Sequence, residues 1–185
     1  MIESLTIPSY IADQAEQWIT SRKVPWYYFN NTLGDKQEGW VDVDPGEYTI
    51  RDMPRFTHYF YPNSQTPKQD NQFVLPLVEW VRNKLLPKAK VVRVMGNLTT
   101  PTLDSQNCIN IPHVDSDNEN MYTFLYYVNN SDGKTVFFKD RKIVYEAQPI
   151  KGTGVWFQSN TPHAGQVPFI NKTRYVINIG FRKRV

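Results

Sequence analysis

The sequence predicts a mainly β fold with flanking helices, a sandwich or jelly-roll barrel that packs its helices outside one sheet. Aromatic residues make up 14% of the 185 residues and prolines number 13, and turn residues divide the second half into short β-type runs. With 40% hydrophobic residues, a chain of this length can bury a core. We expect a single domain over 1–185, with a helical and loop flank over 1–89 and a jelly-roll core over 90–185.

Two segments of the flank have the apolar spacing of helices. Residues 10–22 and residues 71–86 carry apolar side chains three or four positions apart, with polar residues between them. Pro87 ends the second segment, and Pro76 within it is compatible with a helix if it lies in the first turn. Such stripes usually face a protein core, so we assign their aromatic residues no chemical role.

From Lys90 onward, β-branched and aromatic residues gather in short runs that Asn, Asp and Gly separate. The runs cover residues 91–98, 121–128, 135–140, 142–150, 154–159 and 174–181. Regularly spaced short strands after a helical flank are typical of sandwiches and jelly-roll barrels.

Charge and cysteine usage restrict the function classes. The net charge is +3 and the basic residues are scattered apart from residues 182–184, so we expect no nucleic-acid partner. Cys108 is the only cysteine, which rules out an intrachain disulfide. The amino terminus lacks the pattern of a secretory signal, and no apolar run approaches the roughly 18 residues of a membrane span. We therefore expect a cytoplasmic protein that does not bind membranes.

The tripeptide His113-Val114-Asp115 carries the first chemical signal. Residues two apart in an extended chain project from the same face, so the imidazole and the carboxylate would lie side by side. His163, just beyond the run 154–159, is a candidate third ligand. Two imidazoles and one carboxylate form the facial triad of non-haem Fe(II) oxygenases. By itself the tripeptide is a weak signal, because such patterns also occur by chance.

Arg174 sharpens this signal, because it opens the apolar run 174–181 shortly after His163. Val176 and Asn178 share its strand face, whereas the opposite face is wholly apolar and is a core face. An arginine turned inward needs a bound anion, since an unpaired buried charge is costly, and its planar fork matches a carboxylate. A dicarboxylate that chelates iron at one end and meets Arg174 at the other satisfies both requirements.

The motif formed by His113, Asp115, His163 and Arg174 resembles the Fe(II)/2-oxoglutarate-dependent dioxygenases, specifically their prolyl 4-hydroxylase-like branch. The resemblance covers about residues 90–182, including the stretch YTFLYYVNNSDGKTVFF that follows the HxD motif. It implies a double-stranded β-helix, which is a cupin-like jelly roll, flanked by helices. It also implies Fe(II) as cofactor, with 2-oxoglutarate and O₂ as cosubstrates.

The resemblance also implies roles for single residues. His113, Asp115 and His163 match the iron ligands, and Arg174 matches the residue that binds the C5 carboxylate of 2-oxoglutarate. Further positions assigned to the 2-oxoglutarate pocket are Tyr127, Thr135 and Asn178.

A looser resemblance to small phage and bacterial oxygenase-like proteins extends to the amino-terminal part of the chain. It makes Arg93 and Asn97 candidates for the substrate side of the pocket. Thr123, Leu125 and Val176 share strand faces with pocket residues and are candidates for the same side.

The implied activity is a hydroxylase that couples oxidative decarboxylation of 2-oxoglutarate, to succinate and CO₂, with hydroxylation of a small-molecule or peptide substrate. Asp115 favours hydroxylation, because relatives with a small residue at this position use the vacant site for halide. One alternative is a cupin-like metal-binding jelly-roll protein without 2-oxoglutarate-dependent activity, which leaves Arg174 unexplained. Another is a structural or carbohydrate-binding β-sandwich, which the abundant Trp and Tyr would also fit. The sequence indicates neither the substrate nor the oligomeric state.

Overall fold

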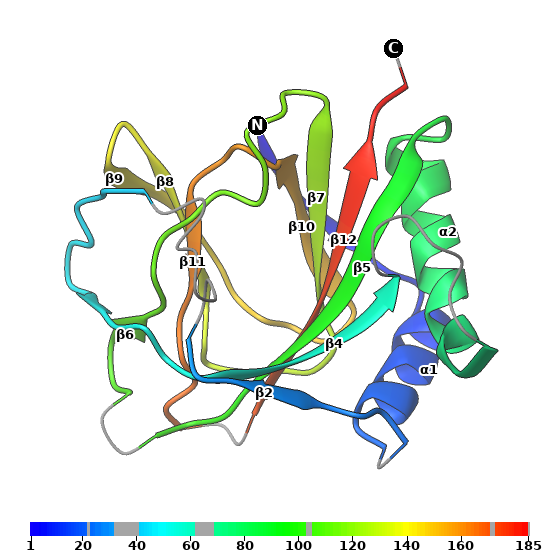
Figure 1. Cartoon of the computed structure of the whole chain (residues 1–185), viewed down its shortest axis with the longest axis horizontal. Coiled ribbons are helices and arrows are strands. Elements are labelled where there is room, and N and C mark those ends of the chain that lie inside the picture. Colours follow the sequence, from blue (N-terminus) through cyan, green and yellow to red (C-terminus); the bar gives the residue numbers. More distant parts are fainter. Residues whose placement is uncertain (22, 32–40, 62–68, 103–104, 171–172, 185) are drawn as a thin grey trace.

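Two antiparallel sheets face each other in this protein, and two helices cover the outside of the larger sheet (Figure 1). The structure is a computed structural model, and it describes all residues except 22, 32–40, 62–68, 103–104, 171–172 and 185. The expected class, a mainly β jelly roll with flanking helices, is confirmed.

The larger sheet has seven strands in the order β1-β10-β7-β12-β5-β4-β2. All neighbours in it are antiparallel. The strands are β1 (Ile2–Thr6), β2 (Tyr27–Phe29), β4 (Arg55–Tyr61), β5 (Lys90–Thr99), β7 (Met121–Tyr127), β10 (Thr153–Gln158) and β12 (Arg174–Arg182). Four of the predicted runs form β5, β7, β10 and β12 of this sheet. The bounds of each strand lie within about one residue of the predicted bounds.

The smaller sheet has three strands in the order β11-β8-β9, on the side of the molecule away from the helices (Figure 1). They are β8 (Thr135–Lys139), β9 (Lys142–Ala147) and β11 (His163–Gly165). A short parallel pair, β3 (Thr49–Ile50) with β6 (Cys108–Ile109), lies beside it. Between the two sheets, Phe137 of β8 packs against Leu125, Tyr127 and Phe157 of the larger sheet.

The sequence led us to expect only helices and loops over 1–89, but this flank also contributes β1, β2 and β4 to the larger sheet. β1 pairs with β10 at one edge, and β4 pairs with β5 near the other. β2 is three residues long and exposed throughout. Edge strands of this kind lack the apolar alternation that identifies a half-buried strand in a sequence, and their pairing partner decides their conformation.

The helices are α1 (Ser9–Ile19) and α2 (Leu75–Leu85), and a 3₁₀ helix (Gln69–Val74) precedes α2. Both are shorter than predicted. Pro76 lies in the first turn of α2 as expected, where its missing N–H leaves no intrahelical hydrogen bond unmade, and the segment upstream is 3₁₀. No helix in the described ranges is long and apolar enough to cross a membrane.

The two faces of β12 point to different layers. Ile177, Ile179 and Phe181 are fully buried in the cluster that joins the sheet to α1 and α2. Arg174 and Asn178 are equally inaccessible but face the opposite side, toward the smaller sheet. The predicted alternation along this strand is therefore confirmed, and it directs polar side chains between the sheets.

Candidate active site

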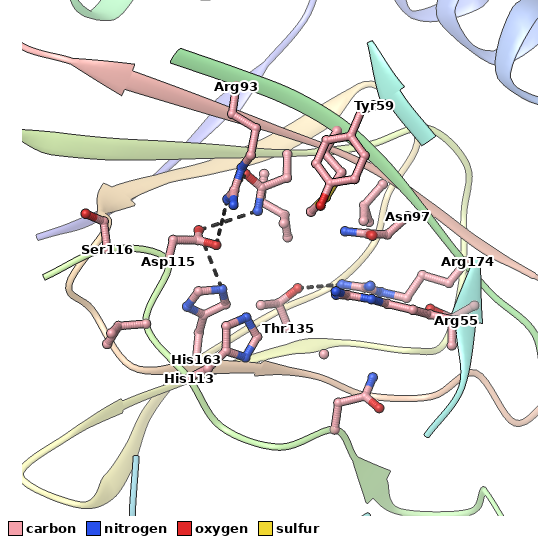
Figure 2. A pocket seen from close by; sticks show the side chains of 18 of the residues that line it. Arg55, Tyr59, Arg93, Asn97, His113, Asp115, Ser116, Thr135, His163 and Arg174 are labelled. Atoms are coloured by element: carbon pink, nitrogen blue, oxygen red, sulfur yellow. Dashed lines mark hydrogen bonds and ion pairs between the residues drawn. The ribbon is translucent and has the colours of Figure 1, made fainter. Parts of the chain in front are cut away.

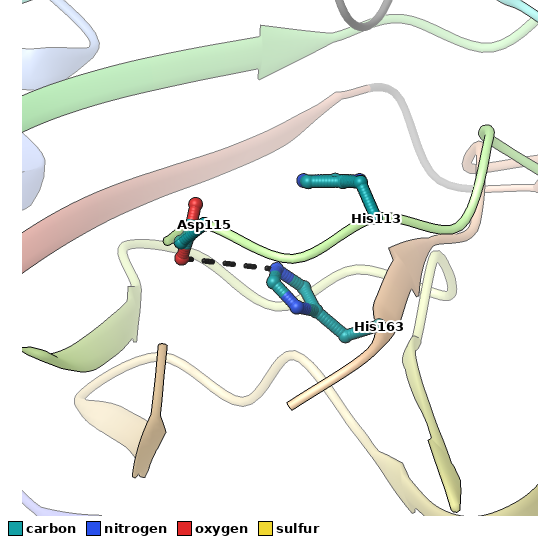
Figure 3. A group of neighbouring side chains, drawn as sticks. All are labelled: His113, Asp115 and His163. Atoms are coloured by element: carbon teal, nitrogen blue, oxygen red, sulfur yellow. Dashed lines mark ion pairs between the residues drawn. The ribbon is translucent and has the colours of Figure 1, made fainter. Parts of the chain in front are cut away.

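The backbone brings together two histidines that are far apart in the sequence. His113 and His163 exchange two backbone N–H···O hydrogen bonds, each 2.9 Å long, which join the segment before β7 to β11. Their ring centroids are 4.7 Å apart. Asp115 completes the group, and the ligand atoms of the three side chains all lie within 4.8 Å of one another (Figure 3).

Hydrogen bonds fix the tautomer of both imidazoles. Nδ1 of His113 lies 2.9 Å from the carbonyl oxygen of Ile111, and Nδ1 of His163 lies 3.0 Å from that of Thr161. A carbonyl can only accept, so Nδ1 donates in each ring and Nε2 keeps its lone pair for a metal. Burial and, next, the neighbouring His163 lower the pKa of His113 to about 4, so this ring is neutral at neutral pH.

Three side chains orient the carboxylate of Asp115. Arg93 Nη2 donates to Oδ1 at 2.9 Å (Figure 2). Thr123 Oγ1 donates to Oδ2 at 2.7 Å, and Asn178 Nδ2 approaches Oδ2 at 3.4 Å. Burial alone would raise the pKa of Asp115, but the charge of Arg93, the two imidazoles and the Thr123 hydrogen bond lower it well below its usual range. Asp115 is therefore held as an ionised ligand in one orientation.

This donor set fits Fe(II). Two neutral imidazole nitrogens and one carboxylate oxygen are the ligands of non-haem iron sites that leave positions open for substrates. Within the described ranges, no other group of three or more His, Cys, Asp or Glu side chains could hold a metal ion.

Arg174 is buried, with 5% of its surface exposed, and has no acidic partner among the described residues. Its Nη2 donates to Thr135 Oγ1 at 2.8 Å, and the Tyr127 hydroxyl donates to the same oxygen at 2.8 Å. Nε of Arg174 is buried without any hydrogen-bond partner. Burial lowers the pKa of this guanidinium. An unpaired buried cation is costly, so this site requires an anion.

A single pocket of about 530 Å³ connects the metal-binding group to Arg174 (Figure 2). Residues predicted from the sequence line it together with residues that were not predicted. The predicted lining residues are Arg93, Asn97, His113, Asp115, Leu125, Thr135, His163, Arg174, Val176 and Asn178.

Three predicted residues lie elsewhere in the site than expected. Thr123 does not line the pocket, because it is buried behind Asp115 and hydrogen-bonds its carboxylate. Tyr127 lies behind Thr135 and reaches the pocket only through the Thr135 hydroxyl. Asn178 lines the pocket beside Asp115, not beside Arg174, because four residues of extended strand separate the two side chains.

Arg55 and Tyr59 also line the pocket and were missed by the sequence analysis. Both lie on β4, where alternate residues share a face, and Thr57 lies between them on that face. The run 55–61 alternates Arg, Thr and Tyr with other residues, a pattern that places these three side chains on one face of a strand. The pattern could predict pocket residues only once this run was recognised as a strand of the sheet.

Comparison with known proteins agrees with this geometry. The family model described as the 2OG-Fe(II) oxygenase superfamily matches residues 105–182, which include the metal-binding group and Arg174. No curated protein matches the chain in sequence.

Several solved structures share the fold. A 2OG-Fe(II) oxygenase family oxidoreductase from Burkholderia pseudomallei is 12% identical, with a TM-score of 0.68 over 98% of this chain and 85% of that one. A prolyl-4-hydroxylase from Pseudomonas putida is 16% identical, with a TM-score of 0.59 over 99% and 92% of the two chains. A viral collagen prolyl hydroxylase from Paramecium Bursaria Chlorella virus-1 is 15% identical, with a TM-score of 0.56 over 99% and 96%.

Proposed function

Because residues 105–182 of this chain match the model of the 2OG-Fe(II) oxygenase superfamily, we propose that the protein is an Fe(II)- and 2-oxoglutarate-dependent dioxygenase that hydroxylates its substrate. One observation carries this proposal. The pocket that holds the His113, Asp115 and His163 group also holds the buried, anion-seeking guanidinium of Arg174.

The metal end of the pocket is organised for an open coordination site. His113 and His163 would present Nε2, and Asp115 would present an oxygen that Arg93 and Thr123 hold in place. When bound, Fe(II) supplies the oxygen-activating chemistry in which 2-oxoglutarate and O₂ yield succinate and CO₂ while the substrate gains a hydroxyl group. The apolar lining residues Leu125 and Val176 would help to exclude water from this end.

The opposite end is organised for the distal carboxylate of 2-oxoglutarate. Arg174 would pair with it through the two-pronged guanidinium, and Thr135 would donate its hydroxyl once Tyr127 and Arg174 saturate its oxygen as donors. Burial raises the pKa of Tyr127 to about 12, so this hydroxyl remains a donor at any ordinary pH.

The alternative, a cupin-like protein that binds a metal without 2-oxoglutarate-dependent activity, would leave Arg174 buried without an anion. That arrangement has no compensation in the described part of the chain. We further propose a cytoplasmic location, supported by Cys108 being the single cysteine of the sequence, which leaves no intrachain disulfide to form. A small-molecule or peptide substrate, and no nucleic-acid partner, fit the scattered basic residues.

The test is an anaerobic titration of the apoprotein with Fe(II) and 2-oxoglutarate. We expect a weak visible charge-transfer band that develops only when both are present, followed by succinate release on exposure to air. His163→Ala serves as the control variant and should give no band. If iron binds to the wild-type protein but no band develops, the cupin-like alternative is correct.

A further inference from the structure

The two carboxylate oxygens of Asp115 lie in different surroundings. Oδ2 lies 4.0 Å from Nε2 of His163, so this oxygen faces the other candidate metal ligands (Figure 3). Oδ1 accepts a hydrogen bond of 2.9 Å from Nη2 of Arg93, and the two groups form an ion pair. A carboxylate can bind a metal through one oxygen or through both. Arg93 therefore contacts the oxygen that Asp115 would need in order to bind through both.

Strand pairing holds Arg93 in this place. Arg93 lies on β5, outside the residues that match the family model, and Thr123 lies on β7. The strand between them, β12, pairs Gly180 with both of these residues. Residues paired across antiparallel strands share a face, so no side chain stands between Arg93 and Thr123 on the pocket side. Each of the two donors thus reaches its own oxygen of Asp115.

Asn178 extends the effect of Arg93 to the second oxygen. Nη2 of Arg93 lies 3.4 Å from Oδ1 of Asn178, and Nδ2 of Asn178 lies 3.4 Å from Oδ2 of Asp115. Because a guanidinium can only donate, this contact orients the amide with its oxygen toward Arg93 and its NH₂ group toward the carboxylate. Arg93 therefore restrains the carboxylate directly at Oδ1 and through Asn178 at Oδ2.

The charge of Arg93 is more than the orientation of a ligand requires. A neutral donor is enough for that purpose, as the hydroxyl of Thr123 shows at Oδ2. A guanidinium at Oδ1 repels a metal dication that would share this oxygen, and it competes with the metal for the negative charge of the carboxylate. Both effects oppose tight iron binding, so support of iron affinity does not account for an arginine at this position.

We propose that Arg93 restricts Asp115 to binding Fe(II) through one oxygen and so keeps three coordination positions open, an inference that rests on the function proposed above. Three protein ligands leave three positions on a six-coordinate metal ion. Chelation of 2-oxoglutarate takes two of them, and O₂ needs the third. If Asp115 bound through both oxygens, the two cosubstrates would compete for the two positions left. Arg93 is thus a positioning residue that acts through Asp115, whereas the sequence had suggested the substrate side.

The test counts the open positions with nitric oxide, a stable substitute for O₂ that binds Fe(II). The protein is loaded anaerobically with Fe(II) and radiolabelled 2-oxoglutarate, and nitric oxide is added. Equilibrium dialysis measures the 2-oxoglutarate that stays bound, and EPR measures the nitric oxide complex. The wild type should hold both ligands together. In Arg93→Met, nitric oxide should weaken the binding of 2-oxoglutarate by about tenfold or more, because the two compete.

Iron affinity separates this role from ordinary support of a metal ligand. Loss of a residue that orients a ligand weakens metal binding by about 10- to 100-fold, and we expect this for Thr123→Val, which loses the bond to Oδ2. Arg93→Met should instead leave the dissociation constant of Fe(II) within about threefold or lower it, because a competing cation is gone. Arg93→Lys keeps the charge and should restore the simultaneous binding of both ligands.

Arg82→Met is the matched control. Arg82 also pairs with a carboxylate, that of Glu79, and its side chain is 33% exposed against 32% for Arg93. It lies on α2 and does not line the pocket, so neither iron affinity nor the simultaneous binding of the two ligands should change. Arg93→Gln, which also removes the charge, replaces Arg93→Met with the same expected outcome if the latter does not fold.

Two results would overturn the proposal. In the first, the neutral variant of Arg93 holds 2-oxoglutarate and nitric oxide together as the wild type does. In the second, it loses iron affinity by about tenfold or more, as Thr123→Val is expected to, which would make Arg93 an ordinary orienting residue. Failure of the proposed function is distinguishable from both, because the wild-type protein with Fe(II) and 2-oxoglutarate would then develop no visible band.

Discussion

The two faces of the seven-stranded sheet are buried to a similar degree, yet they are buried for opposite reasons. On the helix side, Ile177, Ile179 and Phe181 fill an apolar core with α1 and α2. On the other side of the same strand, Arg174 and Asn178 are withdrawn from water with charges or polar atoms that other groups must satisfy. The first face is complete as it stands, whereas the second is complete only with ligands bound.

This difference separates stability from function along one strand. Burying apolar side chains stabilises the fold without any ligand. Burying an unpaired guanidinium costs stability, so a sequence that keeps Arg174 there retains it for binding. Substitutions on the two faces should therefore have different consequences, and the following experiments test that separation.

The largest effect is expected at the metal ligands. His163→Ala should abolish iron loading and reduce succinate production by more than about 100-fold, because one of three ligands is lost. Iron content after loading and succinate release measure it. His58→Ala is the matched control, since His58 is a buried histidine that bonds the carbonyl of Pro25 instead. Unchanged iron content in His163→Ala would contradict the assigned site.

Arg174→Met should separate binding from stability most sharply. The loss of the buried charge partner should weaken 2-oxoglutarate by about 2–5 kcal/mol, measured by anaerobic titration. The apoprotein should unfold at the same or a higher temperature, because an uncompensated buried charge has been removed. A lower melting temperature combined with unchanged 2-oxoglutarate affinity would mean that Arg174 is only structural.

Ile179→Ala tests the helix side of the same strand. This side chain is fully buried, so its truncation should lower the free energy of unfolding by about 2–5 kcal/mol in urea denaturation. The dissociation constants of Fe(II) and 2-oxoglutarate should stay as in the wild type under conditions where the variant is folded. If they weaken together with stability, the two faces are energetically coupled.

The stability of the apoprotein should depend on pH through the pocket face. The pKa of His113 is about 4 in the folded protein, below the value near 6.5 of an unfolded chain. Between these values the unfolded chain binds the extra proton, so stability should fall with decreasing pH by about 1 kcal/mol per pH unit. Denaturation curves from pH 4 to 7 measure this slope, and His113→Asn should lack it.

The smallest effect is expected behind the pocket. Tyr127→Phe removes a hydroxyl that reaches the pocket only through Thr135, so the affinity for 2-oxoglutarate should fall by about two- to tenfold. A loss above about 100-fold, measured in the same titration, would show that this hydroxyl turns to bind the carboxylate directly.

Part of the candidate site could be predicted from the sequence, and particular residues show which part could not. The spacing of His113 and Asp115 and the alternation after Arg174 are local features, and local geometry alone orients such side chains. The position of Asn178 depended on strand length as well as face, so the sequence placed it on the correct face but at the wrong end of the pocket. Arg55 was missed because β4 became a strand only by pairing with β5.

The sequence by itself determined the β-rich class, the strands of the carboxyl-terminal half and the chemical types of the metal ligands, because periodicity and residue chemistry are properties of short segments. The tertiary structure decided which distant segments meet. The reciprocal hydrogen bonds between His113 and His163, and the position of Arg55 in the pocket lining, depend on pairing between strands that no local pattern encodes. The residue types therefore determine the chemistry of the ligands, while non-local strand pairing determines the shape of the site.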